Sequence, residues 1–107
     1  MQLLKNNLKR NNIMSIAILG GIDRLIPHYT KQGRAMGFSN IKVFSKKMPN
    51  MVKRLSKYGA IVICTGNVAH TMVEGTIRMA QNNGIPVGRT HSSGVTAMKK
   101  CLEKISN

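Results

Sequence analysis

The stretch AIVICTGNVAHTMVEGTIRMAQNNGIPVG, residues 60–88, reads as a complete strand, helix and strand unit. Its first five residues form a continuous apolar run, which is typical of a strand covered on both faces. The turn at residues 65–67 offers a helix N-cap, and apolar residues then recur every three or four positions over residues 68–83. Gly84 suits the end of that helix, and residues 85–88 are expected to form the next strand. This order predicts a parallel sheet.

The same alternation continues on both sides of this stretch. Upstream strands are expected at residues 14–19 and 41–45, one helix between Pro27 and Gly37, another between Pro49 and Gly59, and a last helix after Ser92 or Ser93. Right-handed crossovers then favour a sheet order of 2-1-3-4, with the first and last helices on one face and the middle two on the other. We predict an α/β fold, a small Rossmann-like three-layer sandwich with a four-stranded parallel sheet. Residues 13–107 would form one domain, preceded by a basic N-terminal arm at residues 1–12.

The composition is strongly basic and excludes several classes of enzyme. The 107 residues include 17 Lys or Arg but only three acids, for a formal net charge of +14. Asp23, Glu74 and Glu103 are too few for a two-metal nuclease or phosphotransferase, and a glycosidase pair is almost as hard to build. Cys64 and Cys101 have neither CxxC nor His spacing, so we expect buried thiols, no metal and no cofactor.

No apolar run reaches the roughly 18 residues that a membrane span needs, and the first residues lack the apolar core of a signal peptide. We therefore expect a cytoplasmic protein that has no membrane partner.

The loops that follow the four predicted strands are polar and contain or adjoin a cation or a histidine. Helix N-termini at this edge present free N–H groups, and glycine turns let a phosphate approach closely. The strand order also places a topological switch point, where such sheets bind ligands, between the first and third strands. The candidate anion-binding residues are Gly20, Gly21, Arg24, Thr65, Asn67, His70, Arg89, His91, Ser92, Ser93 and Gly94.

Structural roles compete with this interpretation. The Gly20-Gly21 pair lacks GxGxxG spacing and can be a simple tight turn. The hydroxyl and amide side chains can be helix caps and nothing more. His70 stands four residues before Glu74, so a solvated pair on a helix face is an alternative to a role in a site.

The positive charge indicates a polyanionic partner, because only Lys5, Lys9 and Arg10 belong to the arm and the domain holds the rest. We predict a non-enzymatic module that binds DNA or RNA through phosphates with little sequence preference. The residues expected to contact the backbone are Lys31, Arg34, Lys46, Lys47, Lys53, Arg54 and Lys57, with Arg24 beside them.

Two alternatives stay open. One is a nucleotide or phosphometabolite site, possibly enzymatic, in which His70 is the acid or base and Arg89 and Ser93 hold phosphate. The other is a module that binds an acidic protein. The helix at residues 68–83 has few charges and is expected to form a homodimer through Met72, Val73 and Met79.

Residues 60–104 also resemble a family of small bacterial Rossmann-like domains known as domain of unknown function 2325. The matching motifs are Val68-Ala69-His70 after a strand and polar turn, GIPV at residues 84–87, and the Ser-Gly turn at residues 93–94. The opening IAILGGIDR, residues 16–24, matches the glycine turn of the family's first strand. The resemblance implies the fold and no particular activity.

The resemblance further implies one shared site that contains Gly20, Gly21, Thr65, His70, Ser93 and Gly94. The family's usual acid before V-x-H is replaced here by the turn at residues 65–67, which favours anions.

Overall fold

The computed structural model describes residues 15–106 and contains one sheet of four parallel strands. The strands are β1 (Ser15–Leu19), β2 (Asn40–Phe44), β3 (Ala60–Cys64) and β4 (Val87–Thr90), in the order β2-β1-β3-β4. Ile18 at the centre of β1 lies opposite Val43 of β2 and Val62 of β3. The predicted α/β fold and strand order are confirmed. The basic arm at residues 1–12 lies outside the described residues.

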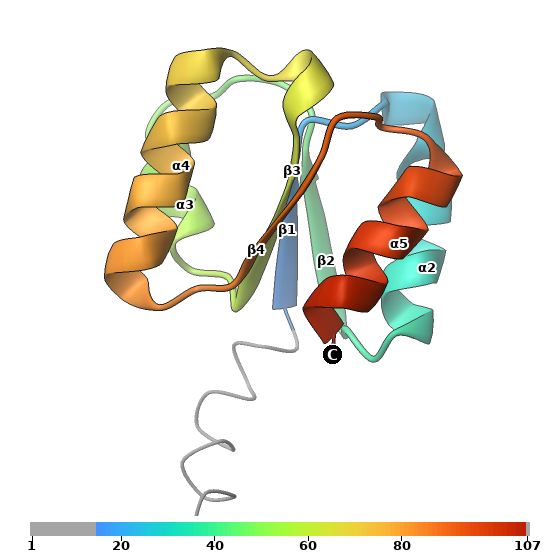
Figure 1. Cartoon of the computed structure of the whole chain (residues 1–107). Coiled ribbons are helices and arrows are strands. Elements are labelled where there is room, and N and C mark those ends of the chain that lie inside the picture. The colour runs from blue at the N-terminus through green and yellow to red at the C-terminus, as the bar shows by residue number, and fades with distance from the viewer. Residues whose placement is uncertain (1–14, 107) are drawn as a thin grey trace, which may run out of the picture.

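Helices cover both faces of this sheet (Figure 1). A short 3-10 turn η1 (Asp23–Leu25) leads into α2 (Ile26–Ala35), which lies beside α5 (Val95–Ser106) on one face. The opposite face carries α3 (Met51–Leu55) and α4 (His70–Asn83), and the 3-10 turn η2 (Thr65–Asn67) follows β3 at the carboxyl edge of the sheet. This is the predicted pairing of helices. Within residues 15–106, no helix combines the length and the apolar character that crossing a bilayer requires.

The core is split by the sheet into two apolar layers. Ile16, Ile18 and Val62 point towards α2 and α5, where they join Tyr29 and Leu102. The alternate residues Ala17, Leu19, Ile61 and Ile63 pack with Leu55 and Val73 beneath α3 and α4. Both faces of β1 and β3 are therefore buried, which explains why these two strands are continuous apolar runs in the sequence.

The last strand lies two residues later than predicted. Gly84 adopts a left-handed conformation (φ 67°), and the N–H of Ile85 donates to the carbonyl oxygen of Ala80 at 2.9 Å, so residue 85 completes the helix end. Pro86 cannot donate to the ladder, although its carbonyl oxygen accepts from the N–H of Ile61 at 3.0 Å. Regular pairing begins at Val87 and continues to Thr90, which makes Arg89 a strand residue.

Two helices are shorter than predicted. The helix expected at residues 68–83 begins at His70, because Val68 is extended and Ala69, with ψ 141°, is the N-cap. The helix expected between Pro49 and Gly59 spans only Met51–Leu55, since Asn50 is left-handed (φ 57°) before it.

The apolar side chains of α4 are used within the domain. Val73 is only 8% exposed, and Met72 and Met79 pack against the same core layer. The expectation that these three residues face a second copy is therefore wrong for Val73, and the methionines are already in contact with the core. A homodimer through residues 68–83 stays a prediction, but these three apolar side chains do not supply an exposed surface for it.

Candidate functional site

Asn67 joins three of the loops at the carboxyl edge of the sheet. Its side-chain N–H group donates to the carbonyl oxygen of Gly21 at 2.7 Å. Its side-chain oxygen accepts from the N–H of Gly21 at 3.4 Å and from the hydroxyl of Ser93 at 3.3 Å. One amide therefore links the loops that follow β1, β3 and β4. The structure brings together these predicted site residues, which are far apart in the sequence.

Tyr29 joins two of these loops, those that follow β1 and β4. Its side chain is fully buried, and its hydroxyl accepts from the N–H of Ile22 at 3.1 Å and donates to the carbonyl oxygen of Ser93 at 2.5 Å. Burial raises the pKa of this phenol, and the hydrogen bond from Ile22 partly offsets the rise. Tyr29 is a structural residue of the site that the sequence did not single out.

Several predicted anion-binding side chains are already engaged in holding the loops. The hydroxyl of Thr65 donates to the carbonyl oxygen of Thr90 at 3.5 Å, and the hydroxyl of Ser92 accepts from the N–H of Gly94 at 3.0 Å. The N–H of Gly66 donates to the carbonyl oxygen of His91 at 3.1 Å. The structural alternative therefore applies to Thr65 and Ser92, whose hydroxyls organise the edge.

His70, His91 and Arg24 lie around this edge as exposed side chains. The Nε2 atom of His70 lies 3.0 Å from a carboxylate oxygen of Glu74, and their side chains are 84% and 56% exposed. An exposed pair of this kind stabilises a helix by only a few tenths of a kcal/mol, about 0.3 to 0.5. This geometry fits the solvated helix-face alternative. His91 and Arg24 are also exposed.

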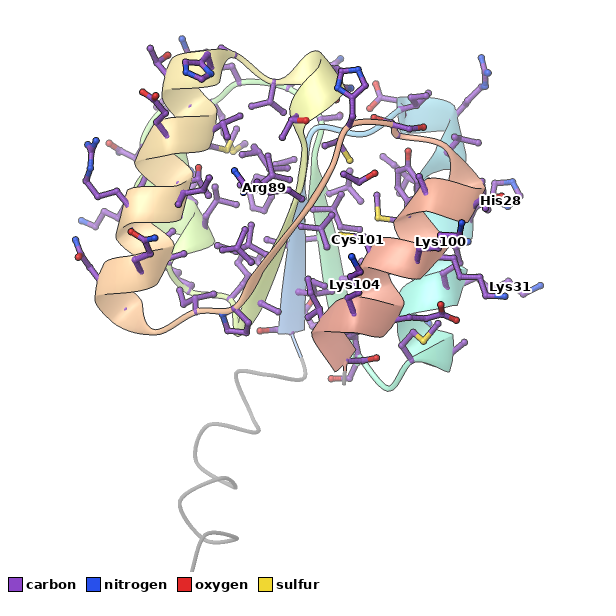
Figure 2. All side chains as sticks on the ribbon, viewed as in Figure 1. His28, Lys31, Arg89, Lys100, Cys101 and Lys104 are labelled. Carbon is purple, nitrogen blue, oxygen red and sulfur yellow. The ribbon has the colours of Figure 1, made fainter. Side chains whose placement is uncertain are left out.

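Arg89 is separated from the loop residues with which it was grouped. Its register opposite Ile63 directs the side chain to the α4 face of the sheet, and Figure 2 shows it between β4 and α4. There it lines a groove with Ile77, Ile85 and Val87. Ser93 instead contacts Tyr29 of the α2 layer. The side chains of Arg89 and Ser93 therefore do not face a common point at which both could hold one phosphate.

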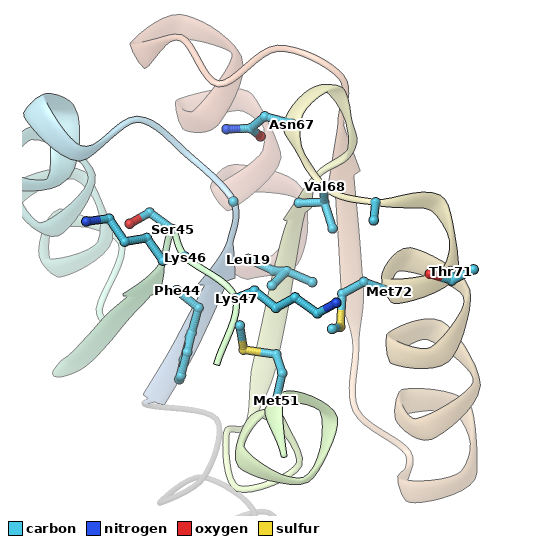
Figure 3. Close-up of a pocket in the computed structure, with 12 residues that line it drawn as sticks. Leu19, Phe44, Ser45, Lys46, Lys47, Met51, Asn67, Val68, Thr71 and Met72 are labelled. Atoms are coloured by element: carbon cyan, nitrogen blue, oxygen red, sulfur yellow. The ribbon is translucent and has the colours of Figure 1, made fainter. Parts of the chain in front are cut away.

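A pocket of about 170 Å³ lies at the carboxyl end of β1, between the loops after β2 and β3. Figure 3 shows its apolar floor and the lysine side chains at its edge. Of the predicted anion-binding residues, Gly20 and Asn67 line it, and Lys46 and Lys47 come from the predicted backbone set. The other lining residues are Leu19, Phe44, Ser45, Met51, Val68, Ala69, Thr71 and Met72.

Gly20 lets the backbone of the loop after β1 approach Asn67 closely at this pocket. Its φ of 92° is a conformation that side chains rarely adopt, and a Cβ there would lie 2.8 Å from both the Asn67 side-chain oxygen and a methyl of Val68. The glycine turn that the sequence singled out therefore has a steric reason. The apolar lining from Val68 to Met72 gave no sequence signal beyond ordinary helix periodicity.

Six cations gather where β2 meets α3, and we call this surface the β2–α3 basic face: Lys42, Lys46, Lys47, Lys53, Arg54 and Lys57. No Asp or Glu occurs between residues 24 and 73. Lys42, Arg54 and Lys57 line a second hollow of about 360 Å³. The Nε–H of Arg54 donates to the carbonyl oxygen of Pro49 at 3.0 Å, which restrains this guanidinium.

Phe44 lies between the two hollows and contributes to both linings. Its ring packs edge to face against Tyr58, with centroids 5.8 Å apart and planes at 85°. Lys42 was missed by the sequence analysis. The exposed lysine between Ile41 and Val43 could have indicated it, because alternation is typical of an edge strand.

The remaining predicted backbone contacts lie elsewhere. Lys31 and Arg34 belong to α2, on the face of the sheet that also carries Lys99, Lys100 and Lys104 of α5. Figure 2 shows Lys31, Lys100 and Lys104 on that layer. The predicted set is therefore divided between the two faces of the sheet.

A comparison with protein families supplies the context for this geometry. The model of a family described as an uncharacterized protein conserved in bacteria (DUF2325) matches residues 15–105, from β1 almost to the end of α5. The chain belongs to the DUF2325 family. Comparison with curated proteins found no match, and comparison with solved structures found none either. The description of the DUF2325 family names no activity.

The cysteines of the DUF2325 domain are core residues. Cys64 and Cys101 are both buried and unpaired, and within residues 15–106 no three His, Cys, Asp or Glu side chains are placed to hold a metal ion. Burial raises the pKa of the Cys64 thiol, which a hydrogen bond with the Ser93 side chain partly offsets. Burial also raises the pKa of Cys101, and the nearby Cys64 adds to the rise.

These raised thiol pKa values predict a loss of stability in alkaline solution. Above about pH 8.5 an unfolded thiol ionises while the folded thiol keeps its proton, so the folded state is penalised by up to about 1.4 kcal/mol per pH unit for each thiol. We expect the free energy of unfolding of the wild type to fall more steeply between pH 8.5 and 10.5 than that of Cys64→Ala or Cys101→Ala. Denaturant unfolding at several pH values measures this difference. Parallel pH profiles in the three proteins would contradict it.

Proposed function

We propose that this DUF2325 domain binds nucleic acid through its phosphate backbone, without catalysis, along the β2–α3 basic face. The observation that carries the proposal is the presence of six Lys or Arg residues within residues 42–57, on one face and without an intervening acid. Two hollows open on that face and are lined by five of the six: Lys42, Lys46, Lys47, Arg54 and Lys57.

The cations of this face are available to an external anion. Among residues 15–106, none of the six forms a salt bridge with a carboxylate. A protein that neutralises several phosphates releases condensed counterions, and the logarithm of its affinity falls with the logarithm of the salt concentration by about 0.9 per duplex phosphate contacted. Six contacts correspond to a slope of about −5.

The first test removes three charges from this face. The variant Lys42→Gln/Arg54→Gln/Lys57→Gln empties the second hollow of cations, and Lys99→Gln/Lys100→Gln/Lys104→Gln removes the same net charge from α5 on the other layer. We expect the first variant to bind a short DNA or RNA about 100-fold more weakly at low salt, with a salt slope smaller by about three. The α5 variant should change affinity by less than about fivefold.

Fluorescence anisotropy at two or more salt concentrations gives both quantities. Equal losses in the two variants would overturn the assignment to this face, since they would reflect net charge alone. Absence of binding by the wild-type domain at low salt, or binding that does not depend on salt, would overturn the proposed function itself.

A further inference from the structure

The pocket at the carboxyl end of β1 combines an apolar floor with a cation at one edge. Leu19, Phe44 and Met51 line one part, while Val68 and Met72 line the part nearer α4. In Figure 3 the Lys47 side chain extends across the pocket towards Met72, whereas Lys46 points the other way. A fully polar anion such as inorganic phosphate leaves such a floor unused. The lining instead fits a ligand that has a flat apolar body and an anionic group beside it.

The size of the pocket limits that body to one ring system. A volume of about 170 Å³ is well below the roughly 300 to 1,000 Å³ of pockets that hold drug-sized ligands. The thioethers of Met51 and Met72 suit contact with an aromatic ring, and a lysine ammonium is attracted to a ring face. A dinucleotide cofactor is too large for this pocket, but a single base fits its dimensions and its chemistry.

The pocket lies next to the hollow at which we propose that phosphates bind. Phe44 separates it from the hollow of Lys42, Arg54 and Lys57, and Tyr58 holds the Phe44 ring from that side. A strand that lies along the β2–α3 basic face with its phosphates on this hollow therefore passes the mouth of the pocket. Bases within a duplex are stacked and paired, so only an unpaired nucleotide can enter without the cost of flipping.

From these observations we propose that the pocket binds one unpaired nucleotide, with the base on the floor of Phe44, Met51 and Met72 and the adjoining phosphate at Lys47. The nucleotide belongs to a single strand or is a free mononucleotide, and the experiment separates these sources. This inference rests on the proposed function only where the nucleotide belongs to a strand.

The first measurement fills the pocket without removing a charge. Ala69 is exposed and lines the pocket, and Ala35 is exposed at the end of α2 on the other layer. We expect wild-type protein to bind a single-stranded octanucleotide at least tenfold more tightly than the same sequence as a duplex. Ala69→Phe should weaken single-strand binding at least tenfold and abolish the preference, while Ala35→Phe stays within twofold of the wild type.

Thr71→Phe enters the pocket from another exposed position and should repeat the result of Ala69→Phe if that variant does not fold. An octanucleotide that carries abasic sites should bind at least tenfold more weakly than the intact one. Equal binding of single strand, duplex and abasic strand would overturn the base pocket, yet salt-dependent binding lost in the Lys42/Arg54/Lys57 variant would still support the proposed function.

The second measurement uses free ligands and needs no strand. We expect AMP or UMP to shift the amide resonances of Phe44 and residues 67–72 and to bind at least tenfold more tightly than ribose 5-phosphate. Lys47→Met should weaken this binding at least fivefold, and Lys99→Met on α5 should leave it unchanged. Mononucleotide binding without any binding of DNA or RNA would overturn the proposed function while supporting the pocket. The proposed pocket would be overturned if mononucleotides bound no more tightly than ribose 5-phosphate and the protein also showed no preference for single strands.

Discussion

Replacement of Gly66 by alanine is expected to lower the free energy of unfolding by about 3 kcal/mol. A Cβ at this position would lie within 3.0 Å of the carbonyl oxygen of His91, which is a backbone atom and cannot rotate away. The loop after β3 and the loop after β4 touch here through the hydrogen bond from the Gly66 N–H. An alanine has to push them apart, which also strains the contact of Asn67 with Ser93.

Thermal unfolding followed by circular dichroism measures this effect, and the melting temperature should fall by roughly 12 to 24 °C. Gly75→Ala is the matched control, because its Cβ would meet only a methyl of Val52 at 3.7 Å within the α4 helix. That change should stabilise the protein by about 0.5 to 1 kcal/mol, since alanine is the better helix former. A melting temperature of Gly66→Ala within a few degrees of the wild type would show that the two loops separate at little cost.

Truncation of Tyr29 to alanine is expected to cost about 3 to 5 kcal/mol, because it removes a fully buried ring from the layer beneath α2 and α5. Tyr29→Phe keeps the ring and removes the hydroxyl that joins Ile22 to Ser93. The Ser93 carbonyl oxygen then loses its donor, and we expect a smaller loss of about 1 to 2 kcal/mol.

Denaturant unfolding of both variants separates the ring from the hydroxyl. Tyr58→Phe provides the comparison, since the Tyr58 hydroxyl makes no hydrogen bond within residues 15–106, and its removal should change stability by less than about 0.5 kcal/mol. If Tyr29→Phe were as stable as the wild type, the bridge between the loops after β1 and β4 would contribute nothing to folding.

The strands and helices were largely predictable because their signals are local. The apolar run of β3 ends at Cys64 in both the sequence and the structure. The start of β4 was misplaced because the backbone of residues 85 and 86 is committed to a helix end and to Ile61 of the neighbouring strand. The hydrogen bond to Ile61 is a tertiary contact, which a local sequence pattern does not reveal. Because β4 begins later than predicted, Arg89 lies in a strand and not in a loop.

The candidate site was predictable only in part. The glycine turn, Asn67 and Ser93 do meet at one edge, because parallel strands place their carboxyl ends together. The sequence could not show that the side chains of Thr65 and Ser92 are used to hold loops, nor that Lys42 shares a hollow with Arg54 and Lys57. These facts depend on strand register and on which loops touch.

The sequence by itself determined the α/β class, the strand order, the family and the large excess of positive charge, since periodicity, turn residues and crossover handedness are encoded over short stretches. The tertiary structure alone decided which of these cations line a common hollow. The helices α2 and α3 lie on opposite faces of the sheet, so Lys31 and Arg34 are parted from Lys46 to Lys57, and the latter share a face with the pocket at the carboxyl end of β1. Which cations act together is a property of the fold, because the sheet lies between groups that are neighbours in sequence.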